Sequence, residues 1–180
     1  SLSGTILEVA AADSAAVGTV GQLAVTVTDG RSDPVPGRVD LTVLASTRPL
    51  PVAADDSVDD AVQGKPVTVD VLANDDNPFP ETPLRILEAT ADGNGTAQIS
   101  GDSIVVTPNP DFVGSMSVQY RVEDKTRQAD RQASAQIRLS VQGRPDSPST
   151  PVVESTRSRT VVLSWDPPAS NGSPITGYTV

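Results

Sequence analysis

Apolar and polar residues alternate along several short stretches of the chain, most clearly from residue 115 to residue 123. The apolar positions there are Met116, Val118, Tyr120 and Val122, and the residues between them are polar. A period of two places the apolar side chains on one face of a β-strand and the polar ones on the other. Residues 132–141 alternate in the same way, so these two stretches predict long neighbouring strands around which the chain is organised.

Residues 51–142 contain enough such stretches for a complete β-sandwich. Turn-forming residues separate them, as at Gly101 and Asp102, where a tight hairpin is expected. The seven predicted strands are Ala54–Val58, Pro66–Leu72, Leu84–Ala89, Thr96–Ser100, Ser103–Thr107, Ser115–Glu123 and Gln132–Val141. Only residues 7–16 resemble a helical pattern, so we expect an all-β fold of tandem Ig-like, Greek-key sandwiches arranged as a rod.

Residues 1–49 repeat the order of motifs found in residues 113–145. In each series a Val-Gly pair, a strand ending in Val-x-Asp, a polar loop and a second strand precede an Arg-Pro dipeptide, at 48–49 and at 144–145. A period near ~100 residues is typical of tandem domains. We therefore expect residues 1–49 to be the C-terminal half of a preceding Ig-like domain, with strands at Leu23–Thr28 and Arg38–Val43 and a weaker one at Thr5–Val9. The alternative is a small three-stranded sheet packed on its neighbour.

Composition narrows the classes of function. The net charge is −10, which disfavours binding to nucleic acids and to anionic membranes, and the chain has no histidine and no cysteine. The usual catalytic triads and dyads cannot be built without those residues. A pair of carboxylates hydrolyses glycosides in other proteins, but here the acids lie at strand ends with no cleft-forming insertion. We therefore expect no enzymatic activity.

Residues 52–142 resemble bacterial Ig-like or cadherin-like tandem repeats. The resemblance rests on Val-Leu-Ala-Asn-Asp at 71–75, on Thr-Pro-Asn-Pro-Asp-Phe-Val-Gly at 107–114, and on the alternating strand that ends at Asp124. The chain departs from that pattern at Met116 and Val118, and it has a proline-rich loop at 77–83. The resemblance implies a large secreted or surface-anchored protein with a scaffolding or adhesive role.

Residues 143–150 form a proline-containing linker that we expect to be extended and semi-rigid. Residues 151–180 resemble the start of a fibronectin type III domain. The resemblance rests on Trp165 at the end of an apolar strand, on the Pro167-Pro168 turn, and on Gly177-Tyr178 in an expected third strand. Asn171-Gly172 also has the form of a turn, and both chain ends are expected to lie inside domains.

Acidic and amide side chains gather at one end of the predicted sandwich, and two interpretations remain open. Hard cations such as Ca²⁺ take six to eight oxygen ligands, which predicts a calcium site. The acids are otherwise solvated or paired with Lys125, Arg127 and Arg131 of the nearby loop. The candidate calcium ligands are Asp55, Asp56, Asn74, Asp75, Asp76 and Asp124. No other cofactor is predicted.

Phe79 lies in the proline-rich loop, where it either packs against the preceding domain and fixes the interdomain angle or stacks on a sugar. Our main interpretation is a structural or adhesive repeat segment of a large bacterial surface or secreted protein. The alternatives are a spacer in a secreted polysaccharide-degrading enzyme and a carbohydrate-binding module. Expected partners are neighbouring Ig-like or fibronectin domains, another protein or a cell-surface glycan, and a second copy bound head to tail through unpaired terminal strands.

Overall fold

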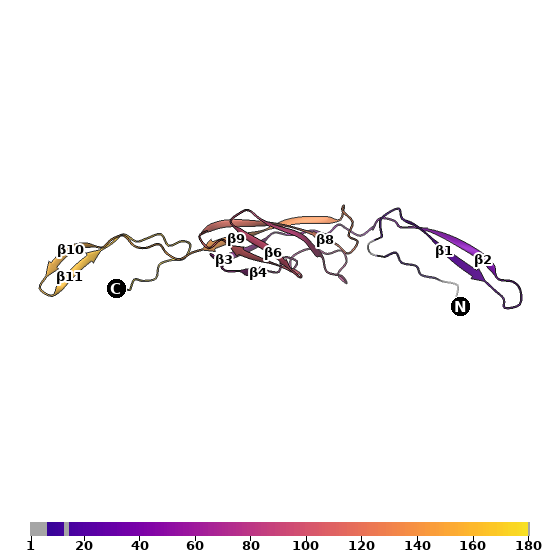
Figure 1. The fold of residues 1–180 in the computed structure, drawn as a ribbon, viewed down its shortest axis with the longest axis horizontal. Coiled ribbons are helices and arrows are strands. Elements are labelled where there is room, and N and C mark those ends of the chain that lie inside the picture. The colour runs from indigo at the N-terminus through magenta and orange to yellow at the C-terminus, as the bar shows by residue number, and fades with distance from the viewer. Residues whose placement is uncertain (1–6, 13–14, 180) are drawn as a thin grey trace.

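The computed structural model describes residues 7–12 and 15–179, and the regular elements among them are all β-strands. The described chain is elongated, with seven strands in the middle and a two-stranded hairpin at each end (Figure 1). Among the described residues, none belongs to a helix long and apolar enough to cross a membrane. The strands are β1 (Val20–Val27), β2 (Val35–Thr42), β3 (Asp56–Val62), β4 (Val67–Val69), β5 (Arg85–Ala91), β6 (Gly95–Ser100), β7 (Ser103–Pro108), β8 (Gly114–Glu123), β9 (Gln132–Gln142), β10 (Val152–Arg157) and β11 (Thr160–Ser164).

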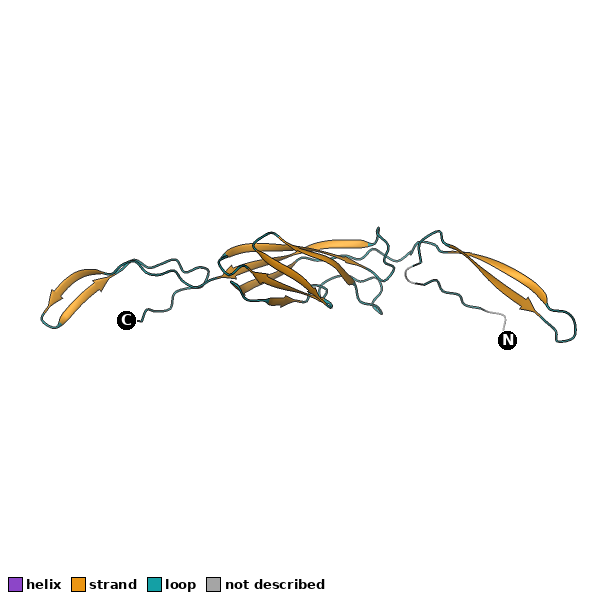
Figure 2. Ribbon diagram, viewed as in Figure 1, coloured by secondary structure: helices purple, strands orange, loops and turns teal. Residues whose placement is uncertain are grey.

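The seven middle strands (Figure 2) form two sheets. The strand orders are β3-β9-β8-β5 and β4-β7-β6. β3 runs parallel to β9, and the other neighbouring strands are antiparallel. All seven strands predicted between residues 51 and 142 are therefore confirmed, with shifted ends. β4 is shorter than expected because the chain turns after Val69, with the amide of Ala73 donating to the carbonyl of Asp70.

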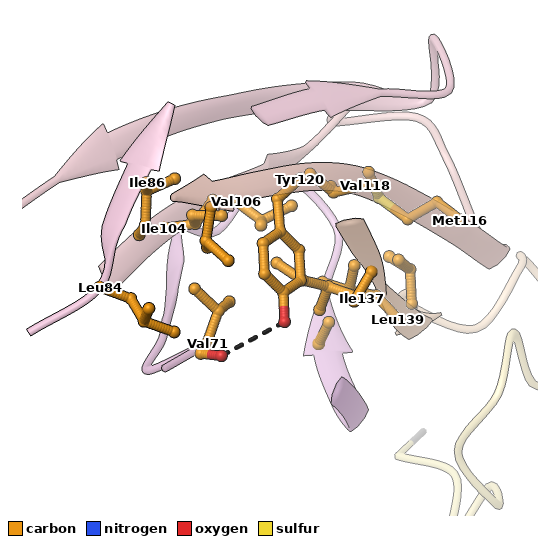
Figure 3. Close-up of a cluster of buried hydrophobic side chains, with 14 residues drawn as sticks. Val71, Leu84, Ile86, Ile104, Val106, Met116, Val118, Tyr120, Ile137 and Leu139 are labelled. Carbon is orange, nitrogen blue, oxygen red and sulfur yellow. Dashed lines mark hydrogen bonds between the residues drawn. The ribbon is translucent and has the colours of Figure 1, made fainter. Parts of the chain in front are cut away.

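The core lies between these two sheets (Figure 3). The alternating residues of β8 and β9 point into it, and so do Ile104 and Val106 of β7. Val118, Val122 and Ile137 are fully buried, as the period of two predicts. Burying an aliphatic side chain contributes roughly 1.5–3 kcal/mol, so this core sustains a domain without disulfides.

The hairpin β1–β2 has the same arrangement as the hairpin β8–β9. Leu23 pairs with Val39 as Val118 pairs with Ile137, and four residues further along Val27 pairs with Val35 as Val122 pairs with Ala133. One face of β1–β2 is therefore apolar, but Val27, Val35 and Val39 on it are exposed. The part of the expected strand Thr5–Val9 that precedes residue 7 lies outside the described residues, and residues 7–9 are not in a strand.

In the C-terminal part, β10 and β11 form a hairpin. The rings of Trp165 and Tyr178 meet edge to face, with 5.3 Å between the ring centroids. The expected third strand through Gly177 is wrong, because residues 165–179 contain no strand. Tyr178 is also exposed rather than in a core.

Candidate functional site

A buried polar contact lies where the N-terminal part of the described chain meets the sandwich. Asp124 directly follows β8 and Arg131 directly precedes β9, so the loop between these strands brings the two side chains together. Nε of Arg131 donates to Oδ2 of Asp124 over 2.7 Å, and both side chains are buried. The terminal nitrogens of Arg131 donate to the carbonyls of Arg48 and Pro49 over 3.0 and 2.6 Å. The buried arginine thus fixes the backbone just before the sandwich.

Phe79 lies beside this contact and is buried, so it is not an exposed aromatic ring and offers no open face to a sugar. The cationic groups of Arg48, Lys125 and Arg131 lie 4.8, 5.1 and 5.7 Å from the centre of its ring. Cations over an aromatic face are attracted to its negative quadrupole. Arg48 also donates to the carbonyl of Pro78 over 2.6 Å, so the Phe79 loop is bound to the segment that precedes the sandwich.

Backbone pairing continues the same contact along the chain. Val52 and Asp76 form an antiparallel bridge with hydrogen bonds of 3.0 and 2.9 Å. The amide of Ala54 donates to Oδ1 of Asp75 over 2.8 Å. We call this set of contacts, between residues 48–54 and the loops at 74–81 and 124–131, the first joint.

Two acids, Asp56 and Asp75, lie near the hydroxyl of Tyr120. That hydroxyl lies 2.8 Å from the carbonyl oxygen of Ala54, 3.1 Å from Oδ2 of Asp56 and 3.2 Å from the carbonyl oxygen of Val71, the last contact being visible in Figure 3. Burial raises the pKa of Asp56 and of Asp75, and Oδ2 of Asp75 is buried without a hydrogen-bond partner. Burial, and then the charge of Asp75, raises the pKa of Tyr120. The phenol therefore acts here as a neutral donor.

The predicted calcium ligands divide between different contacts. Asp56 and Asp75 both lie near the hydroxyl of Tyr120, and Nδ2 of Asn74 donates to the carbonyl of Asp55 over 3.2 Å. Asp76 contributes its backbone to the bridge with Val52, and Asp124 is bound to Arg131.

The carboxylate of Asp55, which directly precedes β3, contacts β9 instead of the hydroxyl of Tyr120. It accepts from the amide of Gln136 and lies 2.8 Å from Arg138, and the amide of Gln136 lowers its pKa. Within the described ranges, no three acids meet in a group that could hold a metal ion. Calcium binding stays a prediction, which unfolding midpoints measured with chelator and with added calcium would test.

A second polar contact lies at the opposite end of the sandwich, after β9. Nδ2 of Asn171 donates to the carbonyl of Arg144 over 2.7 Å and to Oδ1 of Asp146 over 3.0 Å. The amides of Gly143 and Asp146 donate to the carbonyls of Asn171 and Ala169 over 2.8 and 3.0 Å. We call these contacts, between residues 142–146 and 169–173, the second joint.

Sequence reasoning found the loop acids and basic residues but missed two side chains that build the joints. Arg48 reaches Phe79 from a distant part of the chain, and no local pattern indicates that contact. Asn171 matches a turn motif, but its partners Arg144 and Asp146 lie far from it in sequence. The one available signal was the repeated Arg-Pro dipeptide, which lies at both joints.

Two facing sheets of seven strands, with the first strand parallel to the last, define an immunoglobulin-like β-sandwich. The family model described as Bacterial Ig domain matches residues 49–140, more than half of the chain. The chain therefore belongs to the bacterial Ig domain family, and the predicted resemblance of its middle part to bacterial Ig-like domains is confirmed, whereas the cadherin-like resemblance stays a prediction. A bacterial Ig domain is an accessory or structural module, typically non-catalytic and commonly part of an extracellular protein. The match ends before residue 151, so the fibronectin type III resemblance stays a prediction.

Two solved structures are similar to part of this chain. An endo-fucoidan hydrolase from glycoside hydrolase family 107, MfFcnA4, is 19% identical with a TM-score of 0.40, and the alignment covers 73% of this chain. A point variant of that enzyme is 18% identical with a TM-score of 0.40 and 73% coverage of this chain. This chain spans 19% of the length of each of those chains. No curated protein sequence matches the chain.

Proposed function

We propose that this chain is a non-catalytic structural repeat segment of a large bacterial surface or secreted protein, in which β-sandwiches follow one another as a stiff rod. The observation that carries the proposal is the first joint. Arg131 of the sandwich binds the carbonyls of Arg48 and Pro49, and this contact supports a fixed orientation of the N-terminal part relative to the sandwich.

The hairpin β1–β2 supports a tandem arrangement, with residues 1–49 as the C-terminal half of a preceding Ig-like domain. Its apolar strand pairs match pairs of β8–β9, and in both hairpins an aspartate near the start of the loop accepts backbone amides of the loop. Asp29 accepts from the amides of Arg31 and Ser32, and Asp124 accepts from the amide of Thr126. The amide of Ser32, followed by that of Arg31, lowers the pKa of Asp29 to about 2. An aspartate that lies just after the first strand and accepts amides of the following loop therefore occurs in both hairpins.

The buried charged groups also favour a structural role. Glu123 is buried and accepts from Nε of Arg85 over 2.8 Å, and Asp124 is bound to Arg131. A general acid or base needs a carboxyl group that can reach a substrate. These two acids instead hold arginines of the same chain, Glu123 between β8 and β5 and Asp124 in the loop at the first joint.

Nuclear magnetic relaxation of the full chain tests the proposal. Backbone amides of β1–β2 should share the rotational correlation time of β8–β9, because the first joint makes them tumble together. Faster, independent tumbling of β1–β2 would contradict the rod. A catalytic domain elsewhere in the same polypeptide would make this segment the spacer of a secreted enzyme, a role that stiff joints serve equally well.

A further inference from the structure

An Arg-Pro dipeptide follows the last strand of a hairpin at both ends of the sandwich. Arg48-Pro49 comes after β2, and Arg144-Pro145 comes after β9. In both places the carbonyl of the arginine accepts a hydrogen bond from a side chain in the part of the chain that follows. The donor is Arg131 in the first joint, over 3.0 Å, and Asn171 in the second, over 2.7 Å.

The backbone beyond each dipeptide is paired as well. Val52 bridges to Asp76 in the first joint, and the amide of Asp146 donates to the carbonyl of Ala169 in the second. Asp76 lies in the loop after β4, and Ala169 lies in the segment after β11. In each joint this backbone pairing therefore uses the chain that follows the second strand of the next unit, whereas the side-chain donor of the first joint, Arg131, comes from the loop between β8 and β9.

Proline explains why this dipeptide suits the position. It fixes its own φ near about −65° and favours an extended conformation for the residue before it. The arginine is thereby held extended, which leaves its carbonyl available to a donor from the next unit. Two different side chains meet that carbonyl, so the element that recurs is the dipeptide and not its donor.

We infer that the Arg-Pro dipeptide is a repeated docking element of this chain. Its arginine carbonyl accepts a hydrogen bond from a loop side chain of whichever β-sheet domain follows, and the backbone just beyond it pairs with the chain after that domain's second strand. The inference rests on the proposed function, because a docking element between units presupposes a rod of linked units. It goes further in assigning the docking at the second joint to Asn171.

The geometry at Asn171 fits this assignment. Its φ is 54° and that of Gly172 is 99°, a left-handed turn that asparagine and glycine tolerate. The turn directs the side-chain amide at two acceptors, the carbonyl of Arg144 and the carboxylate of Asp146. A carboxylate in place of the amide would donate to neither and would repel Asp146. Asn171 is thus a positioning residue that holds the linker through its NH₂ group.

Hydrogen exchange in the full chain tests the inference, read at the amides of Gly143 and Asp146. Asn171→Gly removes the side chain without straining the positive φ, so exchange should accelerate by about tenfold, as expected for a lost hydrogen bond. Asn171→Asp should accelerate it further, whereas Arg144→Ala should leave it unchanged because only the carbonyl of Arg144 is used. Ser158→Gly, in the distant β10–β11 turn, is the matched control, and unchanged protection of β8 and β9 amides shows that the sandwich stays folded.

The outcomes separate the inference from the proposed function. Wild-type protection that survives in Asn171→Gly or Asn171→Asp would overturn the inference and leave the rod intact. Loss of protection in Arg144→Ala would overturn recognition through the backbone carbonyl. Wild-type exchange at unfolded rates at both amides, together with independent tumbling of β1–β2, would overturn the proposed function itself.

Discussion

Arg131 and Asp124 form an ion pair that is closed off from solvent, with Nε 2.7 Å from Oδ2 and side-chain exposures of 5% and 0%. By contrast, the pair between Arg138 and Asp55 on the outer sheet face is largely exposed. Exposed pairs contribute little to stability, whereas removing one partner of a buried pair leaves an uncompensated charge. Arg131 also binds the carbonyls of Arg48 and Pro49. The stability of the sandwich and the position of the segment that precedes it therefore depend on one side chain.

Replacing Arg131 should therefore destabilise the sandwich strongly. We expect Arg131→Met to lower the free energy of unfolding by roughly 3–5 kcal/mol, because Asp124 stays buried without its partner. Urea denaturation of the full chain measures this. The double variant Arg131→Met/Asp124→Leu removes both charges and should recover most of the stability. It should not restore the hydrogen bonds to the carbonyls of Arg48 and Pro49. A loss below about 1 kcal/mol in the single variant would show that the pair is not buried in solution.

The contact between Arg48 and Phe79 should be energetically coupled. The guanidinium lies 4.8 Å from the ring centre and the Arg48 side chain is half exposed, so the cation over the aromatic ring should contribute about 0.5–1 kcal/mol. A double-mutant cycle with Arg48→Met and Phe79→Leu keeps apolar volume at both positions and isolates this term. We expect a coupling energy in that range from urea unfolding, and a value of zero would place Arg48 away from the ring.

The hydroxyl of Tyr120 should contribute to stability because its single hydrogen lies within reach of three oxygen atoms. In Tyr120→Phe the carboxylate of Asp56 and the carbonyls of Ala54 and Val71 lose the one hydroxyl hydrogen available to them, so we expect a loss of about 1–3 kcal/mol. The exposed Tyr178 provides the control, since Tyr178→Phe should change little. Equal unfolding midpoints for the two variants would rule out a role for the buried hydroxyl.

Asp75 should make stability depend on pH. Burial raises its pKa, so the native state holds the proton more tightly than the unfolded chain. This stabilising contribution is full below the ordinary aspartate pKa of about 3.9 and is lost as the pH rises through the raised native pKa. Asp75→Asn removes the dependence, so the stability of the variant relative to wild type should be greatest near neutral pH and should decrease on acidification. Urea midpoints across this range that differ by a constant amount would contradict the assignment.

The sequence predicts the sandwich well, because each buried strand carries its own alternation of apolar and polar residues. β3 shows where that signal ends. Its second half contains the exposed pair Asp59 and Asp60, and the register with β9 shifts between Val58 and Ala61, so the pattern indicated a strand that ended too early.

The candidate site is less predictable than the fold because its contacts join distant parts of the chain. Phe79 is covered by Arg48, Lys125 and Arg131, and no local pattern contains that arrangement. The predicted acids were located at the correct end of the sandwich, but a list of acids does not reveal which of them already hold an arginine or a backbone amide.

A distance measurement across the first joint tests the rod most directly. The chain has no cysteine, so spin labels can be placed at Arg38→Cys on β2 and Gln98→Cys on β6, both of which are exposed, without removing a native thiol. Pulsed electron paramagnetic resonance on the full chain should give one narrow distance distribution, which should broaden in Arg131→Met/Asp124→Leu. A broad distribution in the wild-type background, unchanged by the double substitution, would contradict a stiff joint.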